Sequence, residues 1–314
     1  MTTLNAAQFS DTLVTAALGV FALALVAYAV AAALPSSRHV RAKVPVSVTG
    51  YRDESVDTQP GTSTEPPNGL GRAAAAITIL GTVLVCLAEV ARGLAAGRAP
   101  WGNMYEFVAA VTLVGVVAWL VVLFRRPGLR RLGVFVLLPV ILLMFLGGTV
   151  LYTQAAPVVP ALRSYWLAIH VTAAVISSGI LLFAGVASVL YLLRSAHDSS
   201  GRMAWTSRLP EASVLDRVAY RATAVAFPIW TFAVITGAIW AEAAWGRYWG
   251  WDPKETTAFI AWVVYAGYLH ARSTAGWRGQ KAAAVNVVGF AVMSFNLFFV
   301  NLVVTGLHSY AGVG

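Results

Sequence analysis

Long apolar stretches separated by shorter polar segments dominate the sequence. Eight of them are long enough to cross a bilayer, which takes about 20 apolar residues in a helix. They cover approximately residues 12–34, 74–96, 104–124, 132–152, 165–193, 219–241, 254–271 and 282–306. The first is too long for a signal peptide and lacks a basic segment before it, so we expect it to be a retained helix. The pattern predicts an all-α integral membrane protein with about eight transmembrane helices.

The polar segments suggest how the chain is divided. Residues 35–72 are rich in Pro, Ser, Thr and Gly, which is typical of a flexible loop. The organisation that follows is a first transmembrane helix in 1–34, a flexible cytoplasmic loop in 35–72, and a transmembrane domain in 73–314.

Composition and charge support this interpretation. Of the 314 residues, 59% are hydrophobic and 11% charged, whereas a soluble domain carries roughly a quarter charged residues. If the N-terminus lies outside and the helices alternate, 17 of the 22 Lys and Arg fall in inner segments, as the positive-inside rule expects. Both termini are then extracytoplasmic, and the net charge of +9 reflects topology without a nucleic-acid partner. A single cysteine, Cys86, excludes an internal disulfide and any CxxC site.

The most distinctive outer segment is residues 240–255. Its aromatic residues are Trp240, Trp245, Tyr248, Trp249 and Trp251. Asp252 and Pro253 are favoured at the N-cap and first position of a helix, so we expect the next helix to begin there. An interfacial aromatic belt is one explanation, but a belt spreads its rings around both rims. The clustering in one loop favours a platform for a flat apolar ligand, with Arg247 or Lys254 available for an acidic group.

Histidines provide a second signal. His170 and His308 lie near the outer ends of their helices, at the level of the aromatic loop. His270 follows Asp252 by 18 residues, about 27 Å along a helix, and is expected near the inner boundary. A lone helical histidine is more often a satisfied polar group than a ligand. Two histidines beside an aromatic loop also fit haem-iron ligation.

Two acidic residues lie in the apolar segments. Glu89 and Glu106 are ionisable groups of the kind that is costly in a membrane and often functional. We slightly favour a structural role, as partners of Arg92 or Arg98 that hold helices together. The sequence contains no Gly-rich phosphate loop, HExxH motif or nucleophile elbow, and no catalytic acid or base can be assigned.

Three motifs together resemble one family. Residues 245–255 (WGRYWGWDPKE) resemble the tryptophan-rich WWD signature of haem-handling proteins in cytochrome c maturation. The segments 101–107 (WGNMYEF) and 306–310 (GLHSY) are similar to companion motifs of one branch, the CcsA/ResC family, also called CcsB in bacteria. This family supplies the haem-handling subunit of the system II cytochrome c synthase. The resemblance extends from about residue 72 to the C-terminus.

The resemblance implies specific roles for residues of this chain. His170 and His308 would be axial ligands of haem b held against the WWD loop at 240–255, and His270 would belong to a haem site within the membrane. The implied binding surface contains Trp240, Trp245, Tyr248, Trp249, Trp251 and Asp252, with weaker support for Trp101, Glu106, Arg247 and Lys254.

The resemblance also implies an activity and partners. The protein would be a cytochrome c synthase (haem lyase) subunit in the bacterial plasma membrane, attaching haem to the CxxCH motif of an apocytochrome c on the extracytoplasmic face. It would act with a ResB-type membrane subunit and an extracytoplasmic thioredoxin-like reductase. Because His270 is the one histidine placed deep in a span, the ResB-type partner is expected to be a separate chain.

Two alternatives stay open. A system I haem exporter shares the WWD motif and loads a haem chaperone. Eight spans and the Gly306–Tyr310 ending favour system II, because the exporter is typically shorter. A non-haem transporter or scaffold could instead use the Trp-rich loop as a membrane anchor.

Overall fold

The computed structural model describes residues 3–33, 69–157, 163–201, 203–274, 276–304 and 306–307, and the regular structure in these ranges is helical throughout. The helices are α1 (Thr3–Ala33), α2 (Gly69–Ala96), α3 (Met104–Arg125), η1 (Pro127–Leu132), α4 (Gly133–Thr149), α5 (Tyr165–Ser200), η3 (Ala204–Arg208), α6 (Ala212–Trp245), α7 (Pro253–Ser273), α8 (Gln280–Leu297) and α9 (Phe299–Val303). Helix α2 begins at Gly69, so the end of the predicted 35–72 loop is helical. The rest of that loop, residues 35–68, lies outside the described residues.

Seven helical segments in the described ranges are long and apolar enough to cross a membrane. They are α1, α2, α3, η1 with α4, α5, α6, and α8 with α9. The chain is therefore an all-α, multi-pass membrane protein, as predicted. The segment expected to form an eighth span is the 21-residue helix α7. It does not join the seven, because Lys254, Glu255, His270 and Arg272 lower its hydropathy.

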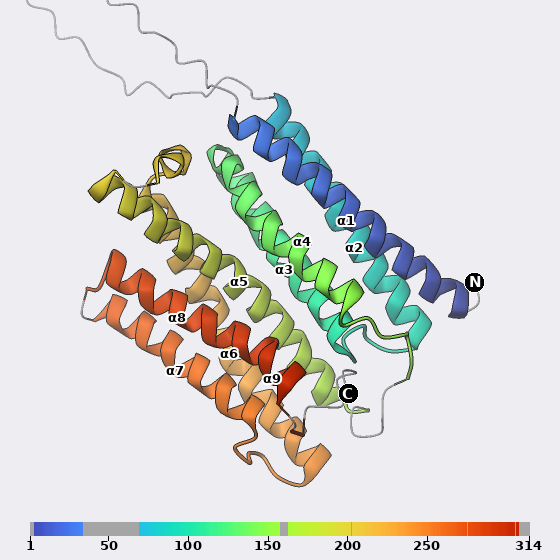
Figure 1. The fold of residues 1–314 in the computed structure, drawn as a ribbon. Helices are drawn as coiled ribbons and strands as arrows, with labels where there is room; N and C mark the ends of the chain where they lie inside the picture. The colour runs from blue at the N-terminus through green and yellow to red at the C-terminus, as the bar shows by residue number, and fades with distance from the viewer. Residues whose placement is uncertain are drawn as a thin grey trace, which may run out of the picture.

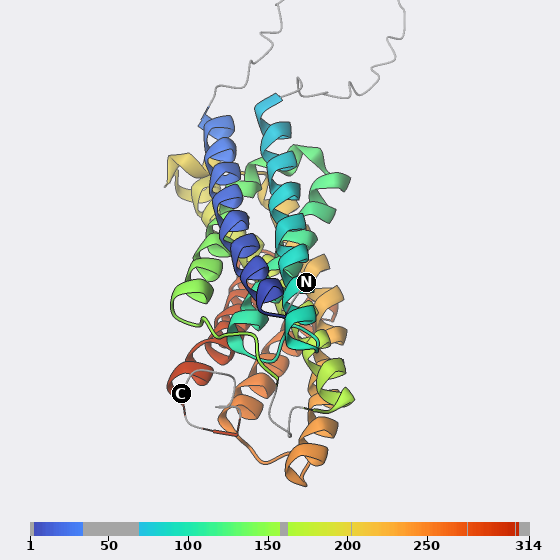
Figure 2. The ribbon, with the colours of Figure 1, turned by 90° about the vertical axis from the view of Figure 1, so that its right-hand side faces the viewer.

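The long helices run roughly alongside one another in a bundle (Figures 1 and 2). In Figure 1, α1 and α2 form one flank, α3 and α4 follow, α5 lies centrally, and α6, α7 and α8 form the other flank. The α2–α3 loop, the α6–α7 loop and α9 gather at the same end of the bundle. The α2–α3 and α6–α7 loops, which are about 150 residues apart in the sequence, thus lie at the same end of the molecule.

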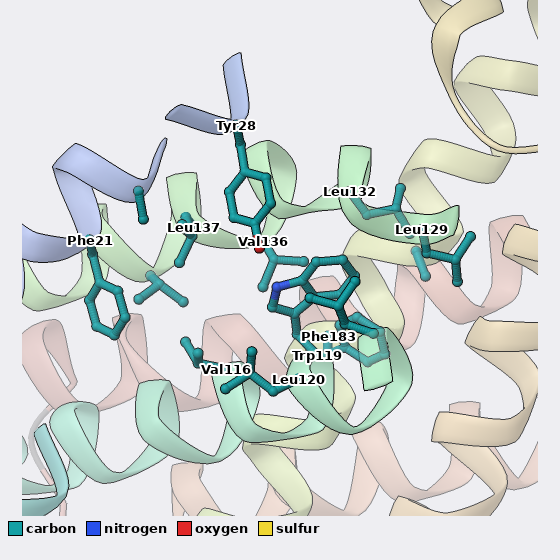
Figure 3. Close-up of a cluster of buried hydrophobic side chains, with 14 of the residues drawn as sticks. Phe21, Tyr28, Val116, Trp119, Leu120, Leu129, Leu132, Val136, Leu137 and Phe183 are labelled. Atoms are coloured by element: carbon teal, nitrogen blue, oxygen red, sulfur yellow. The ribbon is translucent and has the colours of Figure 1, made fainter. Parts of the chain in front are cut away.

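A buried cluster ties α1 to the rest of the bundle (Figure 3). Tyr28 of α1 and Trp119 of α3 are both essentially inaccessible to solvent. Helices in a membrane associate through close packing, which small residues permit. Gly133, at the start of α4, is such a residue: a methyl group built there would lie 2.5 Å from Cε2 of Tyr28. Helix α1 is therefore an integral part of the packed core.

A candidate ligand pocket at one end of the bundle

A pocket opens at the end of the bundle where the α2–α3 and α6–α7 loops meet. It contains about 1180 Å³ of empty space, counting its open mouth, and its walls come from the start of α3, from α5, α6 and the start of α7, and from the α8–α9 junction. Most of the lining is apolar or aromatic, as in small-molecule sites generally. The predicted site residues that line it are Trp101, His170, Trp240, Trp245, Tyr248, Trp249 and Lys254.

His170 is held in a defined orientation on α5. Its Nδ1 lies 2.8 Å from the backbone oxygen of Ala233 on α6. A carbonyl only accepts hydrogen bonds, so Nδ1 carries the proton in the neutral ring and the lone pair is on Nε2. The approach requires Gly237, since a methyl group there would lie 2.7 Å from both Cε1 and Nδ1 of His170. A carbonyl that fixes the tautomer is the usual support for a metal-binding imidazole.

The aromatic residues after His170 form a connected wall. The His170 ring stacks on Trp240, with centroids 6.1 Å apart and planes 8° apart. Trp240 is buried and meets the edge of Trp245 at 4.7 Å. Trp251 is different: it is 67% exposed, does not line the pocket, and packs edge-on against Trp249 at 5.8 Å. The sequence-predicted rings therefore divide into a pocket wall and an outer group.

The α6–α7 loop is braced by two carboxylates at the start of α7. Asp252 is the N-cap, as predicted, and forms a capping box with Glu255. Glu255 Oε2 accepts backbone hydrogen bonds from Gly250 at 2.8 Å and from Asp252 at 3.1 Å. Asp252 Oδ2 also accepts the backbone N–H of Leu307 at 2.9 Å. These bonds give Asp252 a structural role in the loop, since its side chain does not line the pocket.

The two cations that the sequence offered for an acidic group have different environments. Arg247 points back onto the loop: Nη1 lies 3.4 Å from Glu255 Oε1, and the guanidinium lies 6.0 Å from the Trp245 ring centroid. Lys254 lines the pocket, and its Nζ donates to the backbone oxygen of Asn296 at 3.3 Å. Asn296 in turn donates to the Lys254 carbonyl at 2.9 Å. The structure therefore places Lys254, and not Arg247, in the pocket wall.

Glu106 lies beneath the pocket rim and does not line it. It is fully buried and pairs with both Arg92 (3.1 Å) and Arg98 (2.6 Å), which confirms the predicted structural pairing. Its Oε2 accepts the backbone N–H of Gly102 at 2.8 Å, and its own N–H is capped by Asn103 at 2.9 Å. Gly102 and Asn103 do line the pocket, so Glu106 acts on the site through the loop that it holds.

Glu89 does not share this pairing with Arg92. The described ion pairs of Arg92 are to Glu106 and to Asp11 of α1, the latter at 3.2 Å. Glu89 Oε2 is buried without a hydrogen-bond partner among the described residues. Among the described ion pairs, the predicted pairing with Arg92 or Arg98 is therefore seen for Glu106 and not for Glu89.

His270 is separate from the pocket. His270 is exposed near the end of α7, 18 residues beyond Asp252, and is not part of the pocket lining. His308 lies outside the described residues. Of the two predicted haem-ligating histidines among the described residues, His170 lines the pocket and His270 does not, and the pocket also contains most of the predicted rings.

Several polar residues of the pocket escaped the sequence analysis. They are Asn103, Asn296, Asn301 and Ser178, and the indole of Trp230 belongs with them. Ser178 Oγ and Trp230 Nε1 are buried without hydrogen-bond partners in the described part of the chain. Asn296 and Asn301 interrupt an apolar run, and polar residues in such runs signal function or packing. That signal was present in the sequence.

Comparison with known proteins identifies the family. A profile described as "Cytochrome C assembly protein" matches residues 101–308, which include the pocket loops. The CcsA protein of Guillardia theta is 34% identical over 253 residues, covering 74% of this chain and 83% of that protein. The chain belongs to the CcsA family of cytochrome c assembly proteins.

Other similarities agree with the family. The CcsA protein of Synechococcus elongatus is 35% identical over 291 residues, covering 78% of this chain and 89% of that protein. The CcsA protein of Chlamydomonas reinhardtii is 44% identical over 157 residues, and this chain spans only 44% of its length. Among solved structures, cytochrome c haem lyase CcmF has a similar fold, with a TM-score of 0.59 and 18% identity. The match covers 95% of this chain and 47% of CcmF.

Proposed function

We propose that this protein is the haem-handling subunit of a system II cytochrome c synthase. It receives haem b as a substrate and holds it in the pocket for attachment to the CxxCH motif of an apocytochrome c. The observation that carries the proposal is the pairing of His170, whose Nδ1 is bound by a carbonyl, with an aromatic wall in an apolar pocket. In such a pocket an oriented imidazole can bind the central metal of a flat ring system, and the aromatic wall can contact the face of the ring.

Each part of the pocket has a role in this proposal. His170 Nε2 is the donor to iron on one face, and His308 is the second axial ligand. Trp240, Trp245 and Trp249 provide apolar contact for the porphyrin, and Trp251 and Tyr248 are exposed at the loop where a client would arrive. His270 belongs to a second haem site within the membrane, shared with a ResB-type subunit, and its exposure on α7 agrees with a contact to another chain.

The reaction needs positioning more than acid–base catalysis. Each client thiol adds across one vinyl group of haem, so an S–C bond forms, the thiol hydrogen ends on carbon, and the vinyl C=C bond becomes single. The thiols must arrive reduced, which assigns a role to an extracytoplasmic thioredoxin-like reductase. The thioether chemistry belongs to haem and thiols, while the protein excludes water and orients the reactants. We place the pocket on the extracytoplasmic face on the basis of charge distribution, and in a bacterial plasma membrane on the basis of the sequence resemblance.

The direct test is absorption of the purified protein. Protein purified in detergent with its ResB-type partner should show a Soret band from b-type haem, and His170→Ala should weaken or shift that band. His197→Ala, near the end of α5, is the matched control and should leave the band unchanged. A colourless complex that also fails to take up added haem would favour a non-haem scaffold.

Co-expression separates the synthase from an exporter. Together with its ResB-type partner and an apocytochrome, the protein should yield covalently attached haem in a host that lacks its own maturation system. Haem delivered only to a chaperone, with no thioether product, would overturn the synthase assignment and support a system I-like exporter.

A further inference from the structure

Lys254 occupies an unusual position for a cation. It lies at the start of α7 in the wall of a largely apolar pocket, and the described partner of its Nζ is a backbone carbonyl, that of Asn296 at 3.3 Å. An ammonium group has three hydrogens to donate. The neighbouring carboxylate of Asp252 accepts the backbone N–H groups of Lys254 and Leu307. Burial lowers the pKa of Lys254 to about 7, and the nearby Asp252 carboxylate acts to raise it. The protonated form of Lys254 therefore keeps donor capacity for an anion inside the pocket, and an anion bound there would favour that form.

The other charged and polar groups of the pocket fit an anion less well. Arg247 does not line the pocket, and its guanidinium pairs with Glu255, a carboxylate that does line it. At the floor, Ser178 Oγ and Trp230 Nε1 are buried donors without partners in the described residues, but both are uncharged. A carboxylate there would lose its hydration without gaining a cation, which is costly in an apolar site.

We propose that Lys254 binds the acidic edge of the porphyrin by pairing its ammonium group with a propionate carboxylate, and so sets the orientation of haem in the pocket. This inference rests on the proposed function and adds a specificity-determining residue to it. Asn301, whose side chain also lines the pocket, offers a polar neighbour for the same edge. A propionate carboxylate that accepts a hydrogen bond from the Lys254 ammonium gains a charge-assisted bond, which is stronger than a bond between neutral groups.

The test pairs a change in the protein with a change in the ligand. Full-length protein in detergent is titrated with iron protoporphyrin IX and with its dimethyl ester, in which both carboxylates are masked. Wild-type protein should bind the acid more tightly than the ester by roughly tenfold, the size expected for a hydrogen bond to a charged group. Lys254→Met should reduce this preference to about twofold or less.

Two variants serve as controls. Lys281→Met makes the same substitution at an exposed position at the start of α8 and should keep the full preference for the acid. Lys254→Arg keeps the charge and should retain most of the preference. Helix content and unfolding temperature of every variant show whether it is folded.

The outcomes are distinct for the two proposals. If wild-type protein binds neither porphyrin, the proposed function fails. If wild-type protein binds both equally, or if Lys254→Met keeps the preference, haem binding stands and the role of Lys254 is overturned. A preference that disappears in Ser178→Ala but not in Lys254→Met would place the acidic edge at the pocket floor and would also overturn the inference.

Discussion

At the scale of single residues, the pocket depends on one close contact between α5 and α6. The imidazole of His170 reaches the Ala233 carbonyl because Gly237 has no side chain in its path. Most of what fixes the ring, its tautomer and its tilt therefore comes from α6, about 65 residues away in the sequence. Spacing identified His170 as a candidate but could not identify the residues that orient it.

This contact leads to a specific prediction. Gly237→Ala would place a methyl group 2.7 Å from His170 Cε1 and Nδ1, so the ring must rotate or move. We expect a weakened or shifted Soret band with His170 still present. Gly267→Ala on α7, where an added methyl group meets nothing within 4 Å, is the matched control and should keep the wild-type spectrum. Identical spectra for both variants would contradict the orienting role of α6.

At this scale, the sequence predicted correctly those features that depend on residues adjacent in the chain. Asp252 and Pro253 start α7 as expected, because a cap is decided by adjacent residues. The choice between Arg247 and Lys254 was open, because it depends on where Glu255 and Asn296 lie in three dimensions. The same limit explains why Ser178 and Trp230 were not recognised as part of the pocket.

At the scale of helices, Glu106 connects three elements with the rim of the pocket. It pairs with Arg92 of α2 and with Arg98 in the α2–α3 loop, and Arg92 continues to Asp11 of α1 and to the carbonyl of Thr153. Breaking a buried ion pair costs about 3–5 kcal/mol, because the remaining charge stays uncompensated. The network thus holds both the helices and the loop containing Gly102 and Asn103.

Glu106→Gln should therefore lower stability. It removes the negative charge facing two arginines while keeping the shape of the side chain, and we expect a lower unfolding midpoint in detergent, followed by tryptophan fluorescence. Glu242→Gln, an exposed position on α6, should leave the midpoint near that of wild type. Equal midpoints for the two variants would show that the network contributes little to stability.

Packing of α1 allows a second stability test. Gly133→Ala would drive a methyl group into the Tyr28 ring, so α1 and α4 must separate or distort. The expected result is a lower unfolding midpoint than for Gly148→Ala, where α4 has open space beside the glycine. If Gly133→Ala were as stable as Gly148→Ala, α1 would be only loosely attached to the bundle.

The predicted spans and the observed helices differ mainly at their ends. Helix α5 was expected over 165–193 and continues to Ser200, where Gly201 ends it in the left-handed conformation. Hydropathy reports which residues suit lipid, whereas a helix ends where its backbone is capped. In α7 the backbone and the hydropathy disagree. The segment is a regular helix of membrane-spanning length, but its polar residues lower its hydropathy, so it is not among the seven apolar spans.

At the scale of the whole molecule, the two ends of the bundle differ in composition. The pocket, the Trp-rich loop and α9 occupy one end. The Arg-rich connections are elsewhere: η1, with Arg130 and Arg131, joins α3 to α4, and η3, with Arg208, joins α5 to α6. The positive-inside rule assigns the Arg-rich loops to the cytoplasm. This orientation is a prediction from charge and can be measured.

Cysteine labelling tests the orientation. In a Cys86→Ser background, Tyr248→Cys in the exposed α6–α7 loop should react with a membrane-impermeant maleimide in intact cells. Ser199→Cys near the end of α5 should react only after the membrane is permeabilised. The opposite pattern would reverse the topology and place the pocket on the cytoplasmic side.

One carboxylate serves two segments of the chain. Asp252 caps α7 through the Lys254 N–H and also holds the backbone of Leu307. The free energies of these two arrangements are therefore linked, and linkage is reciprocal. A binding event that draws Leu307 away would loosen the start of α7 and the Trp-rich loop, and ordering of that loop by a ligand would in turn favour the contact between Leu307 and Asp252. Communication across the mouth of the pocket then requires no movement of the long helices.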